Sequence, residues 1–333
     1  MRAITQRKYG SFDVLNFEEV NIPEPKPTEV QIRVHAAAVN DWELGLMTGT
    51  PLFMRLFLGL FRPRRTRIPG CDMAGTVEKL GAQASRFKPG DKVYGDLSDT
   101  GFGAFAEYVC VEERALGFMP SNLSFEQSAA IPHAGMLAYQ ALRDIGELQQ
   151  GMSILINGAG GGVGILALQY AKMHKCRVAG VDAYRKQAYM ELLGFDECIN
   201  YEKEDFTQRG REYDLILDVK TDRSPFAYLK ALKPGGKYIT VGGHSGLILL
   251  IVLLRRWILW RQAKTFAVLG LKPNKGLNEF TRLIEAGKFL PAIDKRYPLR
   301  EVPLALKRFA EARQEGKIII RVLQEEILTG DDE

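Results

Sequence analysis

A glycine-rich turn is the stretch whose residue types and spacing point most directly to chemistry. The short apolar run at residues 154–156 precedes the turn, and apolar residues at helical spacing follow it. Strand, turn and helix in this order present backbone N–H groups and the positive end of a helix to a pyrophosphate. Ala159, Gly161 and Gly164 fill the three positions of a dinucleotide-binding fingerprint, with alanine in place of the first glycine. The turn therefore predicts a nucleotide cofactor.

The acidic residue that such a fingerprint requires is also present. Asp182 ends the next apolar run and lies 18 residues after Gly164, about where a carboxylate binds the adenosine ribose. This context favours a dinucleotide site over a glycine turn that merely connects two elements. The residues expected to bind the cofactor are Asn157, Gly158, Ala159, Gly161, Gly162, Val163, Gly164, Asp182, Arg185, Tyr201, Val219, Gly242 and Gly243.

Length and composition limit the class of protein. A chain of 333 residues favours two domains, and its 46% hydrophobic content is typical of a globular protein with a large core. The net charge is +5, and no basic block with aromatic residues suggests a nucleic-acid partner. Four scattered cysteines without a CxxC pair indicate a reducing compartment and exclude a cysteine-rich zinc lobe. Because the N-terminus lacks the apolar core of a signal peptide, we expect a cytoplasmic enzyme.

The periodicity of the sequence changes near Ser124. Up to residue 122 the pattern is mostly that of short strands separated by proline and glycine, as in the alternating run at residues 30–34. After Ser124, strand and helix patterns alternate, which indicates βαβ units on a parallel sheet. The predicted fold class is α/β, with a doubly wound parallel sheet next to a β-rich part.

Short segments in a common order along residues 1–322 carry a family resemblance. They are AAVN at residues 37–40, PGCDMAG at 69–75, FKPGDKV at 87–93, GAFAEY at 103–108, NGAGGGVG at 157–164, PGG at 234–236 and GK at 316–317. With these segments the chain resembles the zinc-independent medium-chain dehydrogenase/reductases of the quinone-oxidoreductase type. The resemblance implies a GroES-like catalytic domain at residues 1–123 and 272–333, interrupted by a Rossmann domain at residues 124–271. It also implies an active site in the cleft between the two.

The sequence leaves the choice between NAD and NADP open. Asp182 would accept hydrogen bonds from the ribose hydroxyls and repel a 2′-phosphate, which favours NAD. Arg185 could instead bind a 2′-phosphate, although Arg185 and Lys186 could also form a solvated start of a helix. Tyr201 occupies the position where similar reductases place a tyrosine beside that phosphate. Because relatives with an acidic residue at this place still accept NADP, the resemblance slightly favours NADP(H).

The resemblance also bears on zinc. Zinc enzymes of this superfamily hold the catalytic metal with Cys, His and Cys, and the corresponding residues here are Asn40, Cys71 and His133. Asn40 is a poor zinc ligand, so we expect no metal. One alternative is a metal site made of Cys71, Asp72 and His133. In the metal-free case, Cys71 would simply be a small buried residue.

Without a metal, hydrogen-bond donors must stabilise the substrate oxygen as hydride arrives. By position in the resemblance, Asn40 and His133 are the expected catalytic residues, which orient the substrate or the nicotinamide amide. The ordinary pKa of histidine also suits His133 for supplying a proton. The alternatives are a structural histidine and protonation by a bound water, as in zinc-free relatives.

Two apolar and basic segments exceed the minimal family pattern. Residues 52–61 and 247–261 combine Phe, Trp and Leu with Arg, but neither reaches the roughly 18 apolar residues of a membrane span. Either they contact a membrane interface, or they form a lid or a subunit interface. Both cases predict a lipophilic substrate.

The function expected from all of this is hydride transfer from NAD(P)H to a lipophilic quinone or an α,β-unsaturated carbonyl. One alternative is a carbonyl or alcohol dehydrogenase, which bound zinc would favour. Another is a non-catalytic protein that senses nucleotides or associates with membranes. Residues 266–271 resemble the edge strand that pairs across the dimer in relatives, so we expect a homodimer.

Overall fold

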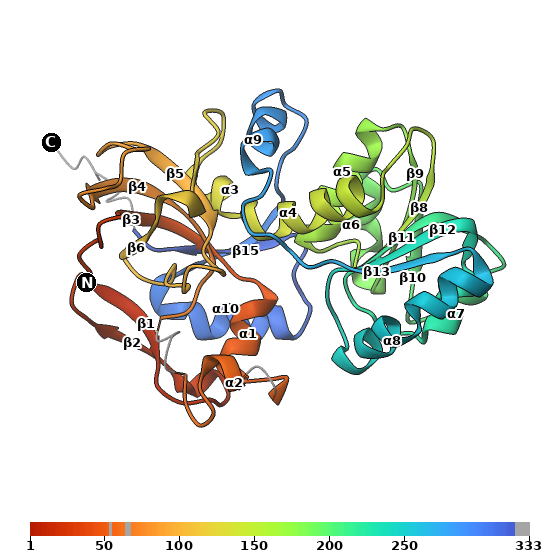
Figure 1. Cartoon of the computed structure of the whole chain (residues 1–333), viewed down its shortest axis with the longest axis horizontal. Coiled ribbons are helices and arrows are strands. Elements are labelled where there is room, and N and C mark those ends of the chain that lie inside the picture. Colours follow the sequence, from red (N-terminus) through yellow and green to blue (C-terminus); the bar gives the residue numbers. More distant parts are fainter. Residues whose placement is uncertain (53–54, 64–67, 324–333) are drawn as a thin grey trace, which may run out of the picture.

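The computed structural model describes residues 1–52, 55–63 and 68–323. Figure 1 shows a β-rich unit and an α/β unit side by side along the longest axis. Phe53 and Met54 of the first apolar segment lie outside the described residues, as do residues 324–333 of the expected C-terminal part of the catalytic domain.

The α/β unit is built on a six-stranded sheet in which every strand pair is parallel. Its strand order is β10-β9-β8-β11-β12-β13. The strands are β8 (Ser153–Asn157), β9 (Arg177–Asp182), β10 (Glu197–Asn200), β11 (Tyr213–Asp218), β12 (Leu232–Thr240) and β13 (Thr265–Val268). The helices that alternate with them are α5 (Gly162–Met173), α6 (Gln187–Leu193), α7 (Pro225–Lys230) and α8 (Ser245–Gln262). The order reverses between β8 and β11, which is where doubly wound sheets bind ligands. The predicted Rossmann-type sheet is confirmed.

The β-rich unit contains a seven-stranded sheet assembled from both ends of the chain. Its order is β14-β15-β3-β4-β5-β7, and β6 also pairs with β3. The strands are β3 (Glu29–Ala38), β4 (Asp72–Leu80), β5 (Lys92–Asp96), β6 (Tyr108–Glu112), β7 (Gly117–Phe118), β14 (Ile293–Pro298) and β15 (Lys317–Arg321). A separate hairpin joins β1 (Arg2–Gln6) to β2 (Leu15–Glu19). The last strand, β15, pairs with β3 in antiparallel direction, so it lies beside residues some 280 positions earlier in the chain.

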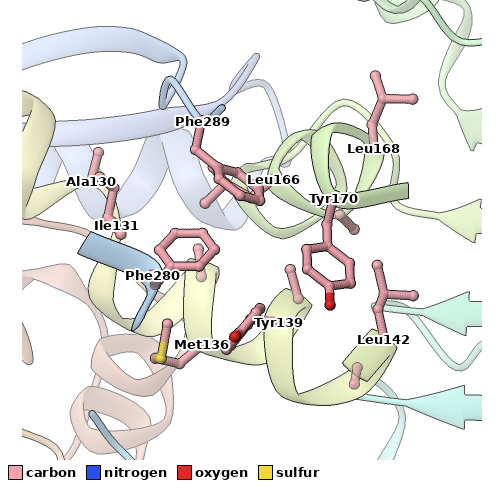
Figure 2. Packing of buried hydrophobic residues seen from close by; sticks show 14 of the residues in the cluster. Ala130, Ile131, Met136, Tyr139, Leu142, Leu166, Leu168, Tyr170, Phe280 and Phe289 are labelled. Carbon is pink, nitrogen blue, oxygen red and sulfur yellow. The ribbon is translucent and has the colours of Figure 1, made fainter. Parts of the chain in front are cut away.

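Helices connect the two units through a shared apolar core. The remaining helices are α1 (Asp41–Thr48), α2 (Arg55–Leu58), α3 (Phe125–Ala129), α4 (Pro132–Gln140), α9 (Leu277–Glu285) and α10 (Val302–Ala310). Figure 2 shows Tyr139 of α4, Tyr170 of α5, Phe280 of α9 and Phe289 within this core. The ring centroids of Tyr139 and Phe280 are 5.4 Å apart. Since α4 and α5 pack here, the start of α4 is held next to the glycine turn that precedes α5.

Some predicted boundaries were wrong. The last apolar strand ends at Val268, so residues 269–271 do not continue it. The helix expected to begin at residue 136 begins at Pro132, because proline fits the first turn of a helix, and the chain continues as a π-helix at Ala141–Ile145. In the described part of the chain, no helix is both long and apolar enough to span a bilayer.

Candidate active site

Asn40 lies at the end of β3, where its side chain meets residues of β4. Its Nδ2 donates to Sγ of Cys71 at 3.1 Å and to Oδ2 of Asp72 at 3.0 Å. The backbone N–H of Asn40 donates to the carboxylate of Glu43 in the first turn of α1, as in a capping box. Glu43 also accepts from the backbone N–H of Cys71. Asn40 and Cys71 are thus fixed by one buried carboxylate.

Lys317, the first residue of β15, places a buried ammonium in the same cluster. Its Nζ lies 2.5 Å from Oδ1 of Asn40 and 3.3 Å from Oδ2 of Asp72, and it also donates to the carbonyl of Val39. The side chains of Lys317 and Asp72 are 5% and 0% exposed. Burial raises the pKa of Asp72, and the charge of Lys317 opposes that rise. A buried carboxylate needs such a partner, because an unpaired charge is strongly destabilising.

His133, the second residue of α4, is held at two points. Its backbone N–H donates to Oδ1 of Asp72 at 2.8 Å, and its Nδ1 lies 2.7 Å from Oδ2 of Asp96 at the end of β5. Among the described residues, no hydrogen bond engages Nε2. Burial lowers the pKa of the imidazole, but the hydrogen bond and charge of Asp96 more than offset this, so the pKa is raised. The arrangement leaves one ring nitrogen free to meet a ligand.

The glycine turn has the geometry that its sequence predicts. Gly158 has a φ of 89°, a conformation that glycine adopts without strain. A Cβ on Gly164 would lie 2.4 Å from the carbonyl oxygen of Ala159, so only glycine allows α5 to approach the strand this closely. A Cβ on Gly161 would meet only the carbonyl oxygen of Gly158, at 3.5 Å. The space in front of Gly161 is therefore open, as a bound pyrophosphate would require.

The polar cluster and the glycine turn touch each other. A Cβ on Gly162 would lie 2.6 Å from Cδ of Lys317 and 3.6 Å from Cβ of Ala134, the residue after His133. The backbone N–H of Gly316 donates to the carbonyl of Gly160 at 3.0 Å. Contacts from β15 and α4 thus bring the predicted catalytic and cofactor residues to one place.

Asp182, the last residue of β9, contacts the glycine turn and the short segment that follows β9. Its Oδ2 accepts from the backbone N–H of Gly160 at 2.9 Å, and its Oδ1 lies 3.4 Å from Nζ of Lys186. Lys186 is buried and Asp182 compensates its charge, so the alternative of a solvated helix start does not hold for Lys186. Burial lowers the pKa of Lys186, and Asp182 opposes this shift. Arg185 is exposed and donates to the carbonyl of Ala312 at 2.6 Å.

The other predicted cofactor residues follow the ends of neighbouring strands. Asn157 ends β8 and donates to Asp218 at the end of β11. Val219 donates its backbone N–H to the carbonyl of Asn157. Tyr201 directly follows β10 and is about half exposed. Gly242 and Gly243 follow β12, and a Cβ on Gly243 would collide with the carbonyl oxygen of Lys220.

The residues near His133 fit a metal ion poorly. The potential ligand atoms of Cys71, Asp96 and His133 lie within 4.8 Å of one another, so Asp96 rather than Asp72 completes the group with this thiol and imidazole. Asp96 is bound to the imidazole, and the amide of Asn40 is bound to the thiol. Burial also raises the pKa of Cys71 well above its ordinary value, which disfavours the thiolate that zinc prefers.

Sequence reasoning missed four residues of these networks. Asp96 and Glu43 are buried acids, and Lys317 and Lys186 are buried bases. Asp96 follows the buried residues Val93 and Tyr94, and three isoleucines follow Lys317; these were the available signals. Asp182 ends a strand and Lys186 lies in the short turn after it, so no helical spacing pointed to their ion pair.

Comparison with known proteins agrees with this geometry. Residues 26–121 match the alcohol dehydrogenase GroES-like domain, and residues 193–320 match the family described as zinc-binding dehydrogenase. The 2-methylene-furan-3-one reductase of Solanum lycopersicum is 32% identical, covering 96% of this chain and 79% of the relative. The NADPH-dependent alkenal/one oxidoreductase of Arabidopsis thaliana is 30% identical with the same coverage. The quinone oxidoreductase structure from Coxiella burnetii superposes with a TM-score of 0.85 at 27% identity, covering 97% of this chain and 99% of the other. The chain belongs to the zinc-independent, quinone oxidoreductase-like family of medium-chain dehydrogenase/reductases.

Proposed function

We propose that this protein is an NAD(P)H-dependent reductase that transfers hydride to a lipophilic quinone or an α,β-unsaturated carbonyl. One observation carries the proposal: the buried imidazole of His133 is anchored to Asp96 through Nδ1, no described residue hydrogen-bonds its Nε2, and the next residue, Ala134, lies against Gly162 of the dinucleotide-type turn. The names of the relatives from tomato, Arabidopsis and Coxiella, which are enone, alkenal and quinone reductases, support the same class of reaction.

In this mechanism the chain's own residues handle the charge and the proton. A nicotinamide, when bound, supplies the hydride. His133 donates a hydrogen bond from Nε2 to the substrate oxygen, where negative charge develops, and then releases a proton to the reduced product. Asp96 stabilises the imidazolium form that this role needs, which agrees with the raised pKa of His133. Both ends of the Asn40 amide are engaged by protein groups, so Asn40 acts as a positioning residue.

The cofactor residues are those predicted from the sequence, with Lys186 added. We assign the pyrophosphate to the turn around Gly161 and the adenosine ribose to Asp182. Lys186 compensates the charge of Asp182, while Arg185 and Lys220 are close enough to Lys186 to lower its pKa. Lys186 beside Asp182 and the exposed Arg185, which precedes it in the chain, offer basic groups to a 2′-phosphate, so we propose NADPH as the preferred cofactor. Changing Lys186 to Met should then weaken NADPH binding more than NADH binding, whereas the exposed Lys230→Met should change neither.

We also propose that catalysis needs no zinc. The ammonium of Lys317 already supplies a cation beside Asp72, and the imidazole and the thiol near it are hydrogen-bonded. Metal analysis of the purified protein tests this directly. Stoichiometric zinc together with alcohol oxidation would favour the alcohol dehydrogenase reading.

The proposed assembly is a homodimer joined through β13. This strand ends the six-stranded sheet, and within the described residues its outer edge has no strand partner. Edge strands present unpaired backbone groups that can pair with a second copy. The four cysteines form no disulfide, which supports a reducing compartment such as the cytoplasm.

The decisive experiment follows NADPH oxidation with an alkyl-substituted quinone and with a medium-chain enone. We expect turnover of at least one of them and a fall in kcat of about 100-fold for His133→Gln. His174→Gln, which changes a histidine on the far end of α5, serves as the control. If His133→Gln retains full activity, then water rather than His133 delivers the proton. If the wild-type protein binds NADPH but reduces neither substrate, the proposed function is wrong.

A further inference from the structure

Helix α8 exposes an apolar stripe that no described part of the chain covers. Ile251 and Ile258 face the interior, and the opposite side of the helix carries Leu249, Leu253 and Trp260. These three side chains are 60%, 69% and 74% exposed. Their spacing of four and seven residues places them along one line of the helix. Exposed apolar surface of this extent on one element marks an interaction site.

The charges on α8 are all of one sign. Arg255, Arg256 and Arg261 lie on the helix, which contains no Asp or Glu. Arg256 belongs to the outer stripe by its spacing, and the guanidinium of Arg261 stacks on the ring of Trp260 with 4.6 Å to the centroid. Trp and Arg side by side on an apolar helix face are typical of helices that lie in a membrane interface. The partner must therefore be both apolar and anionic.

A second copy of the chain is a poor partner for this face. In a twofold-symmetric dimer the same patch meets itself, so the three arginines would oppose their own counterparts without an acidic residue on either helix. A bilayer that contains anionic lipids offers acyl chains to the stripe and phosphate groups to the arginines. Charge complementarity thus selects the lipid surface.

A second apolar segment lies toward the same edge of the molecule. Leu56 lies in α2, and Leu60 and Phe61 follow the end of this helix; Phe61 is 85% exposed. Figure 1 shows α2 and α8 near the lower edge of the view, one in each unit. Leu60 and Phe61 thus add a second exposed apolar site, on the other unit of the molecule.

We propose that α8 docks the protein on the surface of an anionic bilayer, with the stripe Leu249, Leu253 and Trp260 inserted among the lipids and the arginines bound to headgroups. The segment around Phe61 makes the second contact. The role of this surface rests on the proposed function in one respect: lipophilic quinones and enones dissolve in bilayers, so docking would bring the active site to its substrate.

The test is flotation of the full chain with vesicles of phosphatidylcholine alone and of phosphatidylcholine mixed with phosphatidylserine. We expect binding to the anionic vesicles only, weakened by high salt. The double change Leu253→Ser and Trp260→Ser should reduce binding at least about tenfold. Changing Arg255 and Arg256 to Gln should reduce it by about 25-fold, from roughly fivefold for each arginine. Leu192→Ser, at an equally exposed leucine on α6, should leave binding unchanged.

Two further readouts keep the outcomes distinct. Two of the three tryptophans lie on α8, so lipids brominated on their acyl chains should quench the fluorescence of the bound protein. Light scattering reports the oligomeric state of each variant. Absence of binding to anionic vesicles overturns the proposal, and a dimer that dissociates in the Leu253/Trp260 variant identifies the stripe as a subunit interface. Vesicle binding without reductase activity would leave docking intact and refute the proposed function, whereas reductase activity without binding would refute docking alone.

Discussion

The ammonium of Lys317 lies 2.5 Å from the side-chain oxygen of Asn40, although 277 residues separate them in the sequence. This contact joins the last strand of the β-rich sheet to the start of α1, and the stem of Lys317 also passes along Gly162 of the cofactor turn. A single lysine therefore ties the predicted oxygen pocket to the predicted pyrophosphate site.

Replacing Lys317 with Met should destabilise the fold by about 3–5 kcal/mol, because Asp72 would remain buried without a cation. Urea unfolding followed by circular dichroism measures the change. Lys288→Met, at an exposed lysine, is the matched control. Adding Asp72→Asn to Lys317→Met should recover part of the loss, since the unpaired charge is then removed. A Lys317→Met protein as stable as the control would contradict the role assigned to the ion pair.

Glu43 should make the protein less stable as the pH rises from 4.5 to 7. Burial raises its pKa from 4.5 to about 7, and the N–H groups of Asn40 and Cys71 offset this only in part. In this range the folded state keeps a proton that the unfolded state releases, so stability falls by about 3 kcal/mol and is constant above it. Urea midpoints against pH should show a smaller decline for Glu43→Gln than for the wild type. The exposed Glu191→Gln should follow the wild type, and equal slopes for all three proteins would refute the assignment.

Two glycines of the cofactor turn should respond differently to alanine. Gly164→Ala places a Cβ 2.4 Å from a backbone oxygen, so the melting temperature and NADPH affinity should both fall. Gly161→Ala meets no such obstacle and has an ordinary φ of −94°, so stability should change by less than about 1 kcal/mol. Its methyl group nevertheless fills the space proposed for the pyrophosphate, and NADPH affinity should fall at least about tenfold. Thermal melts and fluorescence titrations check both variants, and unchanged NADPH binding by Gly161→Ala would remove the turn from the cofactor site.

The four cysteines should be unreactive in the folded protein near neutral pH. Burial raises the pKa of every one of them, to about 12 for Cys110 and about 11 for Cys198. Because the thiolate is the reactive form, a thiol reagent should label the native chain slowly and the urea-unfolded chain at all four sites. Rapid labelling of a single cysteine in the native state would show that its surroundings differ from those described.

Local patterns were enough to predict the Rossmann-type sheet and its glycine turn. Strand, turn and helix follow one another within residues 153–173, so the predicted geometry depends only on near neighbours. The resemblance placed Asn40 and His133 in one site, and the structure brings both to Asp72.

The charged partners of these residues could not be read from local patterns. Lysine is rarely buried, which made Lys186 resemble a solvated residue until the packing around Asp182 was known. Asp96 meets His133 only because the end of β5 lies beside the start of α4. Asp72 lies next to Cys71 and His133, as expected, but its partners Asn40 and Lys317 were not predicted. Such pairings depend on tertiary contacts between distant segments.

The position of β15 beside β3 has a consequence for the order in which the protein forms during synthesis. A ribosome completes the six-stranded sheet before it translates Lys317, so the α/β unit has all its strands while the seven-stranded sheet still lacks two of its own. Until β15 arrives, Asp72 and Asn40 lack the Lys317 ammonium, and residues 36–38 of β3 lack the strand that pairs with them. The nascent chain therefore carries a complete six-stranded sheet attached to an incomplete seven-stranded one, and addition of the last strand is a late, long-range step.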